Sequence, residues 1–405
     1  MATSDTFTWT IARTAKDGPR PLSFGQERLY LLDRMMPGLG AYNVPTLVRV
    51  AGILDERPLE RAFEAVIARH EILRTRIELI DGTPAQEVME PRPFELSVFD
   101  LRARPAAERE PEARRLLGEL ARRPFDLGGD VLLRAGLAHV GDSDLLLVVF
   151  HHIGSDHVSS ALLFGELDEC YSAQLDGRES ELPLLPIQYA DYAQWQREQL
   201  AGQQLDELIA YWSSKLAGAP DRLELPSDRP RPAVQSYRGE LWEFTIDANL
   251  TERLRDLARR EGVSMFMLLL ATFNVLLHRY TGAEDLVVGA PASGRHHEEI
   301  SSLLGFFSNT LALRSDLSGD PTFSELLGRI KLTTIEAQIH QELPFEKLVE
   351  ALNPDRAQSH SPVFQVLLGY DVAPARPPSL RGHTLEQLSP PGWSWSRFDL
   401  SIVLR

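Results

Sequence analysis

Hydrophobic and polar positions along this chain follow the spacings of helices and of buried strands in turn. Residues 23–35 and 58–75 repeat apolar side chains every three or four positions, which predicts helices with one buried face. Residues 46–52, 132–140 and 144–152 carry short apolar runs bounded by turn residues, the pattern of buried strands. Helices and strands therefore alternate, and we predict an α/β fold.

Two proline-rich passages, residues 181–195 and 223–239, interrupt this alternation, which then resumes. We predict a linker or tail at residues 1–20, a first lobe at 21–180 and a second lobe at 181–405. The chain stops inside an apparent strand, so we expect it to be a piece of a longer protein. In the second lobe we expect strands at 241–246, 285–291 and 362–371 and helices at 251–262, 264–280, 322–338 and 344–352.

Length, charge and cysteine content exclude several classes of protein. The 405 residues suffice for two or three domain-sized units, and 43% of them are hydrophobic. The net charge of −16 argues against binding to nucleic acid or to an anionic membrane. Cys170 is the single cysteine and lies in an amphipathic helical pattern, so we expect neither a disulfide nor a cysteine nucleophile. With no signal-peptide pattern at the N-terminus, a cytoplasmic protein is expected.

Residues 150–160, "FHHIGSDHVSS", bring three histidines and an aspartate together at the end of a predicted strand. Side chains alternate along a strand, so His151 and His152 are expected to point to opposite sides. Adjacent strand residues cannot both bind one ion from a regular backbone, and no HEXXH pattern is present, so we expect no metal site.

The residues after the two histidines read as a turn followed by a helix. Ser155 or Asp156 is placed to cap that helix, and a buried Asp156 would need an arginine partner. His151 is interpreted as a structural, hydrogen-bonded residue. His152 lies beside a helix N-terminus, whose dipole favours the neutral imidazole that can accept a proton. No serine-hydrolase elbow, P-loop or dinucleotide motif is present, and the pattern favours acyl transfer without a protein nucleophile.

The H-H-x-x-x-D pattern resembles the core motif of non-ribosomal peptide synthetase condensation domains. Six further segments resemble the other motifs of that family, in the family's order. They are "LSFGQERLYLL" (22–32), "RHEILRT" (69–75), "YADYAQW" (189–195), "LLGFFSNTLALR" (303–314), "HQELPFEKLV" (340–349), with Glu342 where aspartate is usual, and "SHSPVFQV" (359–366). The style of residues 21–45 and 211–232 looks most like the subtype that joins an L-configured donor to an L-acceptor.

The resemblance implies two chloramphenicol-acetyltransferase-like lobes that form a V with a central tunnel. It implies amide-bond formation between thioester-bound amino acids, and no directly bound cofactor. The substrates would arrive on the 4'-phosphopantetheine arms of donor and acceptor peptidyl carrier domains, next to an adenylation domain. The resemblance also assigns roles to individual residues: His152 is the catalytic residue, and His151, Asp156 and Arg295, the last as partner of Asp156, support the motif. The tunnel and substrate residues are Ser155, His157, Ser308 and Asn309.

His157 departs from the family pattern, because glycine is usual at that position. A histidine there could narrow the channel, provide a second imidazole for an unusual acceptor, or mark lost activity. We favour a modified but active site. The alternatives are a condensation-like platform that binds carrier domains or recruits a partner enzyme without catalysis, and a variant that forms an ester or reshapes its product.

Overall fold

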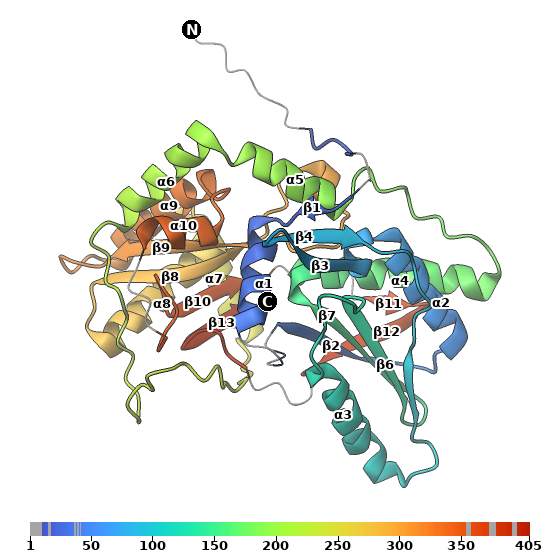
Figure 1. Cartoon of the computed structure of the whole chain (residues 1–405). Helices are drawn as coiled ribbons and strands as arrows, with labels where there is room; N and C mark the ends of the chain where they lie inside the picture. Colours follow the sequence, from blue (N-terminus) through green and yellow to red (C-terminus); the bar gives the residue numbers. More distant parts are fainter. Residues whose placement is uncertain are drawn as a thin grey trace. The chain divides into compact units, whose positions relative to one another are not determined.

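The computed structural model describes residues 10–14, 18–35, 38, 40, 42–353, 358–371, 378–390 and 395–405. The chain divides into two compact units (Figure 1). Unit 1 contains residues 1–199, 295–308 and 374–392, and unit 2 contains residues 200–294, 309–373 and 393–405. The division lies after residue 199, where the sequence pattern predicts one after 180, because the helix at 189–199 packs against the strand at 20–21 and the 3₁₀ turn at 71–74 of the first unit.

Unit 1 is built on a six-stranded sheet in the order β11-β12-β2-β7-β6-β5, with a small sheet β1-β4-β3 beside it. The central strand β7 (Asp144–His151) pairs antiparallel with β2 (Asn43–Val50) and with β6 (Leu133–His139). The other elements are α1 (Phe24–Met35), α2 (Glu56–Arg69), α3 (Ala106–Arg122), α4 (His157–Asp176), α5 (Tyr189–Gln199), β1 (Arg20–Pro21), β3 (Thr75–Ile80), β4 (Thr83–Val88), β5 (Ser97–Asp100), β11 (Ser379–Leu380) and β12 (His383–Leu388).

Strand β7 explains how this sheet is covered on both faces. Its even-numbered residues, from Leu146 to Phe150, pack into the core that α2 and α4 contribute to. Its odd-numbered residues, from Leu145 to Val149, pack with α3 on the opposite face (Figure 1). All eight residues of the strand are buried. The continuous apolar run in the sequence is therefore the consequence of helices on both sides.

Unit 2 contains a four-stranded sheet in the order β13-β10-β8-β9. Strand β10 pairs parallel with both β8 and β13, and β8 pairs antiparallel with β9. Its elements are α6 (Gly202–Leu216), α7 (Ala248–Glu261), α8 (Met265–Thr281), β8 (Asp285–Ala292), β9 (Asn309–Asp316), α9 (Phe323–Ile339), α10 (Phe345–Leu352), β10 (Val366–Tyr370) and β13 (Leu400–Leu404). The mixed α/β class and the predicted helices are confirmed in both units, except that the helix predicted at 58–75 ends at Arg69 and is followed by a 3₁₀ turn at 71–74 and by β3.

One local prediction is wrong. Residues 241–246 form no strand, and Trp242 among them is 84% exposed, because no neighbouring strand pairs with this segment in the described structure. Of the residues predicted as a linker or tail, 10–14 and 18–20 are described and the others lie outside the described residues. Ile11 is buried in the unit 1 core, and both the backbone N–H and the hydroxyl of Thr14 donate to the Asp191 carboxylate of α5.

Among the described residues no single helix is long and apolar enough to cross a membrane. Only α7 and α8 taken together, bent by 102° at their break, reach the required length and composition.

Candidate active site

The two adjacent histidines lie at the end of β7, where the strand changes into a 3₁₀ turn. His151 is the last strand residue, and its backbone pairs in register with Asn43 of β2. His152 begins the turn that runs to Gly154, and its backbone N–H donates to the carbonyl of Tyr42 at 2.8 Å. His152 therefore leaves the regular strand alternation at the strand end, which sequence periodicity does not predict.

The imidazole of His152 is half-buried and held on two sides. Its Nδ1 lies 2.7 Å from the carbonyl oxygen of Ser155, and its ring meets the Phe306 ring edge-on at 4.8 Å. A carbonyl oxygen only accepts hydrogen bonds, so Nδ1 carries the proton. In the neutral ring, Nε2 is then the nitrogen with the lone pair, which is the form a proton acceptor or amine-orienting group requires.

His151 is a buried, hydrogen-bonded residue. Its side chain is buried, with 2% exposed, and its Nδ1 accepts a hydrogen bond from the backbone N–H of Ile153. Its ring packs edge-on against Phe125 at 5.8 Å. Ser155 is also fully buried, and its hydroxyl donates to the His151 carbonyl at 3.3 Å, so Ser155 shapes the turn through both its backbone and its side chain.

Asp156 caps helix α4, which confirms one of the two capping residues that the sequence allows. Its Oδ1 accepts hydrogen bonds from the backbone N–H of Ser159 at 2.9 Å and from the Ser159 hydroxyl at 2.8 Å. The Asp156 N–H donates back to the Ser159 hydroxyl, which completes a capping box. Sequence reasoning missed Ser159, because the usual signal of a capping box is a glutamate or glutamine three positions after the cap.

Asp156 also forms the expected ion pair with Arg295. The guanidinium donates to Oδ1 through Nη2 at 3.0 Å and to Oδ2 through Nε at 3.3 Å. The carboxylate is fully buried and the arginine side chain is 6% exposed. Nη1 of Arg295 donates at 2.8 Å to each of the carbonyls of Ile300 and Leu303. Arg295 thereby ties the start of α4 to the segment before residue 305.

Residues 305–307 are the point where several of the sequence motifs meet. The Tyr189 hydroxyl donates to the Phe306 carbonyl at 2.6 Å and lies 2.9 Å from the Ser23 hydroxyl. Burial raises the pKa of Tyr189 well above its ordinary value of 10, so the hydroxyl stays neutral. At Gly305 an added Cβ would lie 2.1 Å from the Tyr189 ring, so only glycine fits there.

The "RHEILRT" segment contacts the same region through a buried histidine. His70 Nδ1 accepts from the backbone N–H of Leu304, so its Nε2–H donates to Glu166 of α4 at 2.8 Å. Arg69 donates to the other oxygen of Glu166 at 3.0 Å. Burial alone would raise the pKa of Glu166, but the hydrogen bonds from His70 and Arg69 and the positive charge of Arg69 outweigh burial and hold that pKa below its ordinary value. Arg69 and His70 are thus packing residues rather than candidate catalysts.

The remaining predicted site residues occupy different settings. His157 is exposed and is the first residue of α4, directly after Asp156. Ser308, the last residue of its unit 1 segment, is half-buried. Asn309 opens β9 in unit 2, where its amide donates to the carbonyls of Gln341 and Leu343 at 2.8 and 2.7 Å. Its oxygen accepts from the backbone N–H groups of Thr310 and Phe345, so the side chain anchors the loop before α10.

A metal site and a cysteine nucleophile are the two other kinds of active site that the residue types in this chain raise. The described part of the chain contains no group of three or more histidine, cysteine, aspartate or glutamate side chains arranged to hold a metal ion. Cys170 is buried in α4, and burial raises the pKa of its thiol, which disfavours the nucleophilic thiolate.

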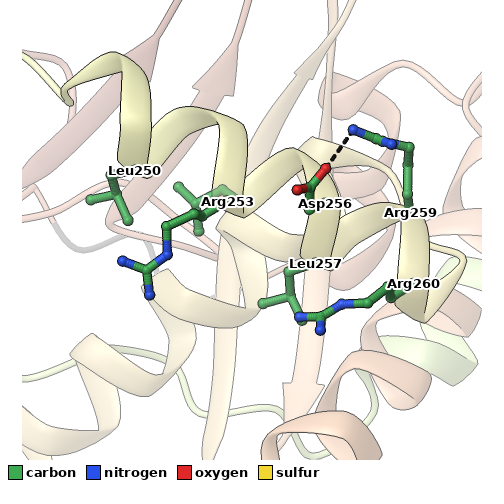
Figure 2. A pocket seen from close by; sticks show the side chains of 7 residues that line it. Leu250, Arg253, Asp256, Leu257, Arg259 and Arg260 are labelled. Carbon is green, nitrogen blue, oxygen red and sulfur yellow. Dashed lines mark hydrogen bonds and ion pairs between the residues drawn. The ribbon is translucent and has the colours of Figure 1, made fainter.

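An open groove runs along α7 in unit 2 and is lined by Leu250, Arg253 and five neighbouring residues of the same helix (Figure 2). Arg259 at its rim is paired with Asp256 at 2.5 Å. None of the predicted site residues lines this groove.

Comparison with known protein families and sequences yields strong matches over nearly the whole chain. Residues 16–405 match the condensation domain family. The chain is 46% identical over 353 residues to one subunit of the linear gramicidin synthase of Brevibacillus parabrevis, a match that covers 87% of this chain and 5% of that protein. It is 43% identical over 357 residues to phosphinothricin tripeptide synthetase PhsB of Streptomyces viridochromogenes, covering 88% and 30%. The chain thus spans a small part of these relatives.

Solved structures match the fold. The X-domain from teicoplanin biosynthesis superposes with a TM-score of 0.86 at 30% identity, covering 98% of this chain and 87% of that one. The first condensation domain of the calcium-dependent antibiotic synthetase, in complex with a substrate analogue, superposes with a TM-score of 0.78 at 24% identity, covering 96% and 87%. At 24% identity, the match to the calcium-dependent antibiotic synthetase domain shows a shared fold alone.

Proposed function

Because this chain belongs to the condensation domain family, we propose that it joins two carrier-bound amino acids by an amide bond, with His152 acting on the attacking amine. One observation carries the proposal: the Nδ1–H of His152 donates to the Ser155 carbonyl, which leaves Nε2 as the basic nitrogen. The buried ion pair between Asp156 and Arg295 holds the turn that presents this ring.

The reaction is an acyl transfer from sulfur to nitrogen. The acceptor's α-amine attacks the donor's thioester carbonyl, a C–N bond forms, the C–S bond breaks, and the thiol leaves with the proton that the amine loses. An α-amine has a pKa of about 8, so part of it is neutral near pH 7 without a strong base. His152 orients that amine and stabilises the charge that develops on it, and its Nε2 takes the amine's proton and passes it to the departing thiolate sulfur as the C–S bond breaks.

The partners follow from the proposed reaction. Donor and acceptor peptidyl carrier domains would present their thioesters on 4'-phosphopantetheine arms, and an adenylation domain would load the acceptor carrier. We propose the subtype that joins an L-configured donor to an L-acceptor, and a cytoplasmic location. His157 is proposed to contact the substrates, because it is exposed and lies directly after the capping residue of α4.

The experiment is a reconstitution with purified carriers loaded with a panel of glycyl, alanyl, leucyl, phenylalanyl and aspartyl thioesters, with dipeptidyl thioester detected by mass spectrometry. His152→Ala should lower the rate of product formation by about 100-fold or more while leaving the far-UV circular dichroism unchanged. His383→Ala, at a half-buried histidine on the β12 hairpin, is the control for histidine loss. Product at the wild-type rate from His152→Ala would refute the catalytic assignment.

The platform alternative has one observation in its favour, the likeness to an X-domain that has also been solved in complex with OxyB. A platform would bind loaded carriers or a partner enzyme but would form no dipeptidyl thioester with any pair of the panel. His157→Gly separates the two cases further. In a modified but active site it changes the rate or the acceptor preference, whereas on an inactive platform it changes neither.

A further inference from the structure

The Phe306 ring packs edge-on against the His152 imidazole: the centroids lie 4.8 Å apart and the planes are inclined by 70°. We infer that Phe306 is a positioning residue for His152, and that the Tyr189 hydroxyl holds Phe306 in place. The catalytic part of this inference rests on the proposed function.

The hydrogen bond at Nδ1 restrains the His152 imidazole but does not set the tilt of its ring. The ring is attached at Cγ and held at Nδ1 by the Ser155 carbonyl, and small tilts about these two points still displace Nε2. Rotation about the terminal bond of a histidine side chain has only broad minima, so the torsion angle alone restrains the ring weakly. An edge-on aromatic neighbour opposes such tilts, because inclined rings lose favourable contact when either one turns. Phe306 therefore restrains the direction in which Nε2 points.

Phe306 is itself seated by groups from three other elements. The Tyr189 hydroxyl of α5 donates to the Phe306 carbonyl at 2.6 Å. The N–H of the next residue, Phe307, lies 3.4 Å from Asp156 Oδ2. The Phe306 ring also lies against Gly25 of α1, where an added Cβ would approach its Cε1 to 2.6 Å. The peptide group after Phe306 is thus anchored at both its carbonyl and its N–H, so a substitution of the side chain leaves the backbone in place.

The contact between Phe306 and His152 predicts a loss of activity without a large loss of stability, which ordinary core packing would not predict. Phe306 is half-buried, so replacing its ring by leucine removes little buried surface and should not unfold unit 1. The loss should appear in the orientation and tautomer of one histidine instead. Loss of a positioning residue of this kind lowers kcat and leaves KM nearly unchanged, because the residue acts on His152 and does not bind the substrate.

The test compares Phe306→Leu with Phe99→Leu, a half-buried phenylalanine on β5 that serves as the matched control. Two properties are measured on the full 405-residue chain: kcat and KM with the loaded-carrier panel, and the His152 tautomer from long-range ¹H–¹⁵N NMR, assigned with His152→Ala. We expect Phe306→Leu to lower kcat roughly three- to tenfold, with KM within about twofold, and to reduce the share of the Nδ1–H tautomer. Phe99→Leu should change neither property.

Tyr189→Phe provides a second, gentler perturbation, since it removes only the hydroxyl that holds the Phe306 carbonyl. It should shift the His152 tautomer in the same direction by a smaller amount. An unchanged tautomer in both Phe306→Leu and Tyr189→Phe would overturn the inference, whatever the activity. A shifted tautomer in a chain that forms no product with any substrate pair would uphold the positioning contact and refute the proposed condensation reaction instead.

Discussion

Replacing Arg295 by alanine is expected to destabilise unit 1 far more than an ordinary arginine substitution does. The change leaves the Asp156 carboxylate, which is fully buried, without its cationic partner. It also removes one donor from each of the carbonyls of Ile300 and Leu303, which receive 2.8 Å hydrogen bonds from Nη1. The four hydrogen bonds of one guanidinium to two carboxylate oxygens and two carbonyls are lost together.

The magnitude follows from the burial of the pair. Removing one partner of a buried ion pair costs about 3–5 kcal/mol, because the remaining charge stays in a medium of low dielectric. The Asp156 carboxylate keeps three donors, two from Ser159 and one from Phe307, which places the expected cost toward the lower end of that range. For a unit of this size, about 3 kcal/mol corresponds to a fall in Tm of roughly 6–12 °C.

Urea unfolding followed by circular dichroism measures the total loss, and hydrogen exchange of peptides from residues 156–170 and 295–308 locates it. The control is Arg102→Ala, which removes an exposed arginine that bonds Asp100 through two nitrogens at 2.8 and 2.6 Å. This control should leave the unfolding midpoint nearly unchanged, because exposed pairs contribute little. If Arg295→Ala shifts the midpoint no further than Arg102→Ala, the argument from burial is refuted.

Three further results are expected. The pKa of Glu166 is held below its ordinary value, so the stability that this carboxylate contributes is present above about pH 4.5 and is lost as pH falls through the lower pKa of the folded state. Glu166→Gln should therefore flatten the acid side of a plot of the urea-unfolding midpoint against pH. An unchanged plot would contradict this reasoning. Gly305→Ala should destabilise unit 1 by about 1–3 kcal/mol, because the new methyl group would overlap a buried tyrosine ring. Its control is Gly165→Ala in α4, where the space around the glycine is open; this substitution should be neutral or stabilising by up to about 1 kcal/mol. Asn309→Asp should lower the stability and hence the Tm of unit 2, because each of the two carbonyls that lose the amide donor costs about 1–3 kcal/mol. The control is Asn249→Asp, at an exposed residue in the first turn of α7, which should not lower the Tm. Equal effects of the two substitutions would refute the anchoring role of Asn309.

In the structure, most of the motifs that resemble the condensation family contribute side chains that hold one short backbone segment, residues 304–307, in place. Tyr189, whose hydroxyl also bonds Ser23, donates to the Phe306 carbonyl; His70 accepts from the Leu304 N–H, and Asp156 accepts from the Phe307 N–H. These residues lie far apart in the sequence but share the backbone of residues 304–307. Most of the motif residues are therefore explained by packing around the site, and the proposed catalytic role falls to His152.

The sequence by itself determined the α/β class, the fully buried strand β7, a helix cap at Ser155 or Asp156 and the need of a buried Asp156 for a cationic partner. Each of these depends on local periodicity or on the cost of burying a charge, and both can be evaluated one segment at a time. The helices of unit 2 were predictable for the same reason. The hairpin β11–β12 was not, because it joins the sheet of unit 1 by pairing with β2, more than 300 residues earlier in the chain.

Only the tertiary structure decided which way the His152 ring is held and what holds it. The turn after His151, the carbonyl of Ser155 and the ring of Phe306 meet at one point, although Phe306 lies far along the chain from both histidines. Long-range contacts of this kind leave no period in the sequence, because each partner reads locally as an ordinary turn or apolar residue. Residues 241–246 illustrate the converse: an alternating apolar pattern forms a strand only where a neighbouring strand is available to pair with it.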